Sequence, residues 1–215
     1  MRKLVRGEGP HCLTRYRHGV HRWSLESPTP PEREQVWEHL RTMQGTRCAY
    51  CEADIGRPGR SHIEHFRQRD RHPQGTFDWS NLFGSCNRED TCGKFKDACG
   101  PYEHSDLLKP DVDEPDDFFI YVNDGTIAPR DNLDEPARKR AIETLRIFNL
   151  DAQNGALREM RREAIRPYLD TAQTIMEMLE EFSPSDIQAF IDGEIQNIAH
   201  LPFATSIRHT LSVMA

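Results

Sequence analysis

The sequence predicts an α+β fold in which a small metal-stabilised module forms the N-terminal part and helices form the C-terminal part. Three observations support this prediction. All six cysteines and eight of the ten histidines of the 215-residue chain lie before residue 111. A strand–turn–strand pattern follows, and the segments after Leu133 carry apolar residues at helical spacing. We therefore expect two parts, residues 1–110 and residues 111–215.

The first part contains one predictable helix and a long irregular stretch. Residues 1–30 are rich in Arg, His, Gly and Pro and predict an irregular arm. A short helix should follow Pro31 and end at Gly45, because four apolar residues recur at helical spacing: Val36, Trp37, Leu40 and Met43. Residues 46–110 show little helical periodicity and are dense in Cys, His, Arg and Gly. This stretch is where we expect the metal-stabilised module.

The second part begins with an acidic linker and a small hairpin. Residues 111–117 hold five acids, and residues 118–122 and 126–128 predict two strands joined by an Asn-Asp-Gly turn. Helix starts are predicted at cap residues and prolines, namely Asp134, Gly155, Ser183 and Pro202. Pro167 should kink or divide the second of these helices. Their apolar stripes predict a helical core without a catalytic role.

The charge of the chain is divided unevenly. The formal net charge is −7, which for the whole chain argues against a nucleic-acid partner. Residues 1–110, however, carry 18 Lys and Arg against 15 acids, whereas residues 111–215 carry 10 against 20. No apolar run suits a membrane helix or a signal peptide, so we expect a cytoplasmic protein. Six reduced cysteines then favour metal ligands over disulfides.

The cysteine spacing predicts a structural zinc site. Cys48-Ala49-Tyr50-Cys51 is a C-x-x-C knuckle, and Cys86 follows 34 intervening residues after it. Four thiolates around one Zn²⁺ form a tetrahedral site. The expected ligands are Cys48, Cys51, Cys86 and either Cys92 or Cys99. A redox role for the first pair is the alternative, but the βαβ context of such a motif is missing.

A second group of polar residues lies between the cysteine pairs, in His62-Ile63-Glu64-His65-Phe66 and Trp79-Ser80-Asn81-Leu82-Phe83. A neutral imidazole can take a proton from water, and a carboxylate can hold a divalent cation. Five arginines lie between residues 57 and 71 and suit phosphate oxygens. These residue types predict phosphodiester hydrolysis. The alternative is a surface strand with solvent-exposed histidines and a solvated basic face.

Together these motifs resemble the zinc-knuckle form of the HNH, or ββα-metal, endonucleases. The resemblance rests on the C-x-x-C knuckle, on Glu64-His65, on Asn81-Leu82 sixteen residues after His65, and on the second cysteine pair followed by Lys96. More narrowly, the chain resembles the PtuB family, the HNH component of Septu and some retron antiviral systems. That likeness covers most of residues 1–150, including Cys48 to Glu52, Ile63 to Phe66, Trp79 to Phe83, Thr91 to Lys96 and the hairpin at residues 119–127.

The resemblance implies a role for each matching residue. His65 would be the general base, Glu64 would bind a catalytic Mg²⁺ or Mn²⁺, and Asn81 would hold the His65 loop through backbone hydrogen bonds. Arg67, Arg69 and Lys96 are expected to contact nucleic acid. The implied function is a metal-dependent endonuclease acting on DNA, or else RNA. It would be the effector of an antiviral defence complex with a PtuA-like ABC- or SMC-type ATPase, to which the C-terminal helices would dock.

Two features depart from the family pattern. The position after the last knuckle cysteine, where many HNH enzymes carry an Asn or His metal ligand, is Gly93 here. Asp97, one helical turn later, is the predicted substitute, with the alternatives Asn87, Asp90 and His62. In addition, consecutive strand residues point to opposite faces, so the strand must end or twist at Glu64 and His65 for both to reach one phosphate. A non-catalytic zinc-ribbon binding module is the alternative function.

Overall fold

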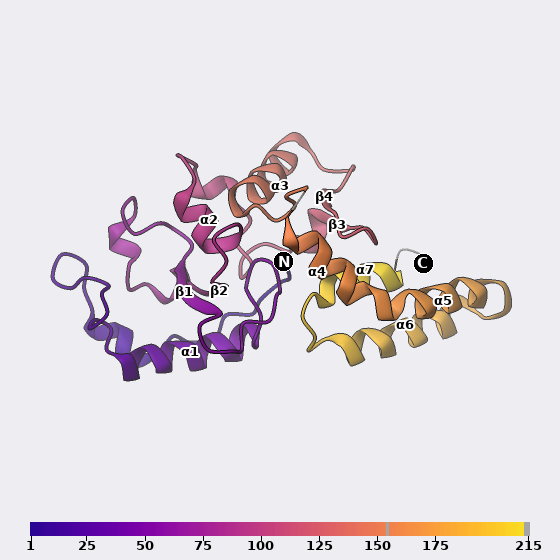
Figure 1. The fold of residues 1–215 in the computed structure, drawn as a ribbon, viewed down its shortest axis with the longest axis horizontal. Coiled ribbons are helices and arrows are strands. Elements are labelled where there is room, and N and C mark those ends of the chain that lie inside the picture. The colour runs from indigo at the N-terminus through magenta and orange to yellow at the C-terminus, as the bar shows by residue number, and fades with distance from the viewer. Residues whose placement is uncertain (154, 213–215) are drawn as a thin grey trace.

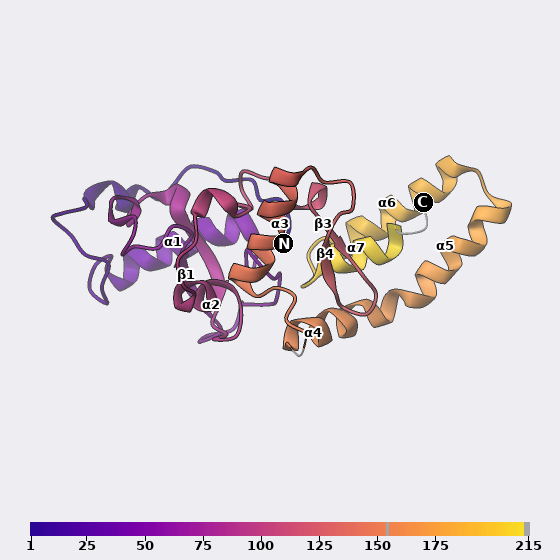
Figure 2. The ribbon, with the colours of Figure 1, turned by 90° about the horizontal axis from the view of Figure 1, so that it is seen from above.

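The computed structural model describes residues 1–153 and 155–212, and of residues 179 and 180 only the backbone. It is a mixed α+β structure, as predicted, with two antiparallel two-stranded sheets in the described part. The molecule is elongated, with the N-terminal module at one end (Figures 1 and 2). The other end is formed by four helices: α4 (Ala156–Ile165), α5 (Leu169–Glu181), α6 (Pro184–Ile198) and α7 (Ala204–Ser212).

The N-terminal arm is irregular, as predicted, apart from one 3₁₀ turn at His11–Arg15. Helix α1 (Pro30–Gln44) follows it. Thr29 and Glu32 form a capping box, in which each side chain pairs with the backbone of the other residue. Gly45 ends the helix with a φ of 67°, a conformation that favours glycine. The predicted helix is therefore confirmed at both ends.

The metal-stabilised module is a strand–strand–helix unit. Strand β1 (Ser61–His65) pairs antiparallel with β2 (Leu82–Cys86), which places Glu64 opposite Phe83. Helix α2 (Cys92–Ala98) then packs against β2. With seven residues, α2 is too short to produce a periodic apolar pattern, so the periodicity did not reveal it.

The second sheet and the later helices follow the predicted signals. Strands β3 (Phe119–Tyr121) and β4 (Ile127–Pro129) form the expected hairpin, and Asp134 caps α3 (Glu135–Phe148) by accepting a hydrogen bond from the Ala137 amide. A 3₁₀ turn over Arg166–Tyr168 separates α4 from α5, so Pro167 divides the predicted helix. Ser183 caps α6, whereas α7 begins two residues after Pro202.

The hydrophobic core does not divide at residue 110. One core contains buried residues from Met1 to Leu157 together with Phe203, so apolar packing continues across residue 110 into β3, β4 and α3. A second, smaller core joins α5, α6 and α7. Ala164 of α4 packs against both cores. Buried Glu52 also links the N-terminus to α7, because its carboxylate lies 2.9 Å from the Met1 ammonium and accepts a hydrogen bond from the Thr205 amide. None of the helices within the described residues has the length and apolarity to cross a membrane.

Candidate active site

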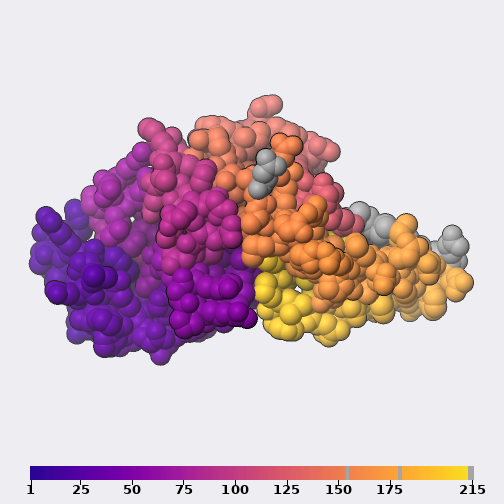
Figure 3. Space-filling model, in the orientation of Figure 1, coloured from indigo at the N-terminus to yellow at the C-terminus, as the bar shows by residue number. Residues whose placement is uncertain are grey.

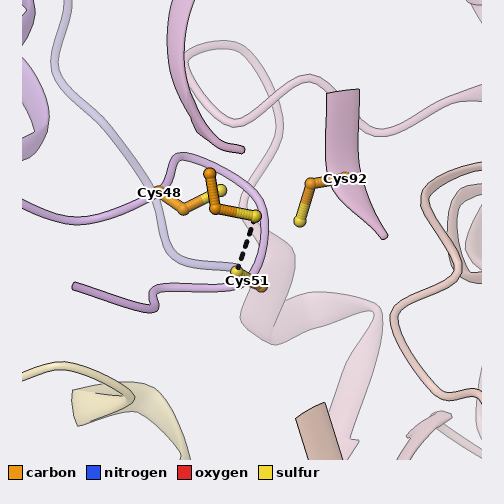
Figure 4. A group of neighbouring side chains, drawn as sticks. Cys48, Cys51 and Cys92 are labelled. Atoms are coloured by element: carbon orange, nitrogen blue, oxygen red, sulfur yellow. Dashed lines mark hydrogen bonds between the residues drawn. The ribbon is translucent and has the colours of Figure 1, made fainter. Parts of the chain in front are cut away.

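Four cysteine thiols converge beside the strand–strand–helix unit. Cys48, Cys51, Cys86 and Cys92 are all buried, and their Sγ atoms lie within 4.8 Å of one another. Figure 4 shows three of these side chains turned toward a common centre, and the Sγ atoms of Cys51 and Cys86 are 4.0 Å apart. A tetrahedral Zn²⁺ with Zn–S bonds of about 2.3 Å separates its sulfurs by about 3.8 Å. The cluster therefore has the ligand type, number and spacing for a structural zinc.

The cluster also decides which cysteine is the fourth. Cys99 lies apart from it, with its Sγ 3.7 Å from the Ile147 carbonyl oxygen, so Cys92 completes the set. Burial alone would keep the thiols protonated, but hydrogen bonds from the other three cysteines lower the pKa of Cys48 well below its ordinary value. Burial conversely raises the pKa of Cys92. A bound cation would replace the remaining thiol protons, because cysteine binds metal as the thiolate.

Hydrogen bonds tie the cysteine cluster to β2 and α2. The Ala49 amide donates to the Gly84 carbonyl over 3.0 Å, which holds the first knuckle against β2. The Gly93 amide donates to Ser85 Oγ over 3.1 Å and so fixes the start of α2. Hydrogen bonds, as well as the four cysteines, therefore hold β2 and α2 in place around the cluster.

Glu64 extends from β1 toward α2 and is buried with Lys96. The Lys96 Nζ lies 2.8 Å from Glu64 Oε1, and it also donates to the His65 carbonyl over 3.0 Å and to Asp97 Oδ1 over 2.7 Å. Burial is the largest single influence and opposes the charge of Lys96, but Glu64, Tyr102 and Asp97 together outweigh it and raise the pKa of the lysine. Lys96 has 0% exposure, so the predicted contact between this lysine and nucleic acid is wrong.

Asp97 does not meet Glu64 as the predicted second metal ligand. The Lys96 ammonium lies between the two carboxylates, and the Asp97 side chain is 55% exposed. The residue that the fold does bring to Glu64 is His62, whose Nε2 lies 3.3 Å from Glu64 Oε2. His62 and Glu64 share one face of β1 because side chains two residues apart in a strand point the same way.

Several buried polar atoms around Glu64 have no hydrogen-bond partner among the described residues. They are His62 Nδ1, Tyr50 Oη and Tyr102 Oη, and Glu64 Oε1 itself has the ion pair with Lys96 but no hydrogen bond in the described part of the chain. Burial and then the Glu64 charge raise the pKa of Tyr50, and the pKa of Tyr102 is likewise raised by burial. Buried polar groups are normally hydrogen-bonded. A carboxylate and an imidazole beside such atoms fit a hydrated divalent cation.

His65 is the last residue of β1, so the strand ends where the sequence required it to end. Its Nε2 lies 2.9 Å from the Thr76 carbonyl oxygen, and its ring packs edge-on against Trp23 of the arm, with 4.7 Å between the ring centroids. Because a carbonyl only accepts, Nε2 carries the proton and Nδ1 keeps a free lone pair. Burial lowers the pKa of His65 to about 4, which keeps the imidazole neutral near pH 7.

Asn81 holds the loop that follows His65. Its Oδ1 accepts from the Arg67 amide over 2.7 Å, and its Nδ2 donates to the carbonyls of Arg67 and Gly75 over 3.1 and 3.0 Å. The Asn81 carbonyl also accepts from the Phe66 amide over 2.9 Å. These contacts are the backbone hydrogen bonds that the sequence led us to expect of this residue.

The remaining predicted residues divide by exposure. Arg67 and Arg69 are exposed beside the His65 loop, and Arg69 donates to the Trp23 carbonyl over 3.3 Å. Phe66 and Phe83 are buried and pack against each other inside the module. Sequence reasoning gave no role to Thr76 or Trp23, because their proximity to His65 arises from loops without a sequence signature.

Comparisons with known proteins leave the chain without an assigned family. A scan against protein-family models gives no match, and a search of the curated proteins gives no significant match.

Proposed function

We propose that the chain is a metal-dependent endonuclease of the HNH type. The observation that carries this proposal is the placement of Glu64 and His65 at the end of β1, in a strand–strand–helix unit whose helix starts at the cluster cysteine Cys92. Zinc on the four cysteines would be structural, because a site with four protein ligands has no open position. Catalysis would then belong to the separate group around Glu64 and His65.

The chemistry follows from the neutral imidazole and the buried carboxylate. His65 Nδ1 accepts a proton from a water molecule, and the water oxygen attacks the phosphorus. The bond from phosphorus to the 3′ oxygen breaks, and the leaving 3′ oxygen takes a proton from solvent, which leaves a 5′-phosphate and a 3′-hydroxyl. A divalent cation held by Glu64 would neutralise charge on the scissile phosphate and the leaving oxygen. Asn81 keeps the His65 loop in place, and exposed Arg67 and Arg69 bind the flanking phosphates of DNA or RNA.

The acidic C-terminal helices support a dependent nuclease rather than an independent one. Residues 167–207 contain seven acids and no Lys or Arg, so this region repels nucleic acid. It also carries exposed apolar side chains along α5 and α6, including Leu169, Met176, Phe182 and Phe190. The two helices extend away from the module (Figure 3). We propose that they dock on a PtuA-like ATPase partner in an antiviral defence complex.

A specific observation favours a second candidate, a zinc-ribbon binding module. The buried ion pair with Lys96 gives Glu64 a structural role that needs no catalysis. The two candidates differ in nicking activity with the partner ATPase and Mg²⁺ or Mn²⁺. If the chain is a nuclease, His65→Ala abolishes nicking while zinc content stays the same. Equal cleavage by wild type and His65→Ala would refute the catalytic assignment, and cleavage by neither would favour the binding module.

A further inference from the structure

The face of β1 that lies against α2 places an imidazole and a carboxylate side by side. His62 Nε2 is 3.3 Å from Glu64 Oε2, the His62 side chain is 25% exposed, and the Glu64 side chain is 1% exposed. The imidazole therefore lies between solvent and the buried carboxylate. A cation entering from solvent would reach both groups from one side.

Gly93 at the start of α2 makes this arrangement possible. A Cβ atom added at Gly93 would lie 2.6 Å from Glu64 Cδ, which is closer than real Cβ contacts allow. Any side chain at this position would displace the Glu64 carboxylate from its place beside His62. In many HNH enzymes the residue at this position is a metal ligand. Here it is Gly93, whose lack of a side chain leaves space for the Glu64 carboxylate.

Lys96 limits how Glu64 can bind a cation. The Lys96 Nζ lies 2.8 Å from Glu64 Oε1, whereas Glu64 Oε2 faces His62. Asp97 lies on the far side of this ammonium and pairs with it over 2.7 Å. A cation would therefore take one oxygen from Glu64 and would find its second protein ligand in His62.

We propose that Glu64 Oε2 and His62 Nε2 are the protein ligands of the divalent cation, with Gly93 providing the space and Lys96 holding the carboxylate. The catalytic role of this cation rests on the proposed nuclease function. A pair that mixes an imidazole with a carboxylate suits transition metals, whereas Mg²⁺ prefers oxygen ligands alone. The site consequently prefers Mn²⁺ to Mg²⁺.

The test measures Mn²⁺ binding to the zinc-loaded full chain, by calorimetry and by the electron paramagnetic resonance signal of free Mn²⁺. We expect one Mn²⁺ site in the wild type, a loss of affinity of at least about tenfold in His62→Gln, and complete loss in Glu64→Gln. The matched control Asp97→Asn should bind within about twofold of the wild type, and Mg²⁺ should compete only weakly. Wild-type affinity in His62→Gln, or an equal loss in Asp97→Asn, would overturn the proposal.

A measurement on the unmutated chain guards against a variant that misfolds. In histidine-detected NMR, Mn²⁺ should broaden the ring signals of His62 before those of His72 and His104, whose rings pack edge-on against each other. Broadening that spares His62 contradicts the proposal. Its failure is distinguishable from failure of the proposed function. If Mn²⁺ binds at His62 but no nicking occurs, the metal site is supported and the nuclease function is refuted. If nicking occurs without Mn²⁺ binding at His62, the nuclease function is supported and this metal site is refuted.

Discussion

The Nζ atom of Lys96 lies 2.8 Å from Oε1 of Glu64, and neither side chain reaches solvent. Two opposite charges therefore share the interior beneath α2. Each charge makes burial of the other tolerable, because an unpaired ion in a protein interior costs several kcal/mol. The pair also fixes which oxygen of Glu64 remains available to a ligand.

Removing the ammonium should destabilise the module strongly. Lys96→Met leaves Glu64 as an uncompensated buried charge, so we expect a loss of about 3–5 kcal/mol in the free energy of unfolding. Urea unfolding of the zinc-loaded chain measures this loss. The double variant Lys96→Met with Glu64→Leu should recover much of it, because both charges are then absent. If Lys96→Met unfolds at the wild-type urea concentration, the ion pair does not support the fold.

Zinc should be lost with Cys92 and kept without Cys99. Cys92→Ser removes a ligand of the four-cysteine cluster, whereas Cys99→Ser changes a thiol outside it. Metal analysis should find one zinc per chain in the wild type and in Cys99→Ser, and little in Cys92→Ser. Because a structural zinc contributes directly to folding, a chelator should also reduce the circular dichroism signal of the module. Retention of zinc in Cys92→Ser would contradict this assignment.

Two glycine substitutions should have opposite effects. Alanine at an exposed mid-helix glycine usually stabilises, by up to about 1 kcal/mol, and Gly193 of α6 has open space around it. Gly93→Ala instead forces a Cβ against Glu64, and overpacking costs about 1–3 kcal/mol. Thermal unfolding of both variants gives the comparison. A stabilised Gly93→Ala would mean that Glu64 can move away without cost.

Asn81→Ala should loosen the His65 loop. The substitution removes three hydrogen bonds to the backbone of Arg67 and Gly75, with an expected loss of about 2–4 kcal/mol. Hydrogen exchange of the Arg67 amide should accelerate most. Asn87→Ala is the matched control, since the Asn87 side chain donates a single hydrogen bond, to the Gly59 carbonyl. Unchanged protection at Arg67 in Asn81→Ala would exclude the clamp.

The stability of the protein should fall in mild acid partly because of His65. Burial lowers the folded-state pKa of His65 to about 4, below the unfolded value near 6.5, so the unfolded chain binds the extra proton between these two values. Stability from this group is present above about pH 6.5 and is lost as the pH falls, by about 2 kcal/mol between pH 7 and pH 5.

The His65 contribution can be separated from acid release of zinc. Urea unfolding of wild type and His65→Phe at pH 7 and pH 5 gives the change in the free energy of unfolding for each protein. Subtracting one change from the other cancels the effect of zinc, which the two proteins share. We expect the wild type to lose about 2 kcal/mol more than His65→Phe. An equal loss in the two proteins would show that His65 is not buried in its neutral form.

Local sequence signals predicted most of the secondary structure. Gly45 at the end of α1, the Asn-Asp-Gly turn and Pro167 each act through neighbouring backbone atoms, so their effects could be predicted without knowing the fold. Apolar periodicity gave no signal for helix α2, because seven residues hold too few turns for a pattern. Apolar packing across residue 110 could not be predicted, because charge composition does not report which apolar side chains pack together.

The sequence by itself determined the chemistry available to this protein: a cluster of soft thiolates, the Glu64-His65 pair and an acidic helical end. Tertiary structure decided which of these groups meet. The close approach of α2 at Gly93 brought Lys96 to Glu64 and left Asp97 outside, and the packing of the cysteines placed Cys92 rather than Cys99 in the cluster. Partners of a buried side chain are set by packing between elements distant in sequence, and residue spacing alone does not specify that packing.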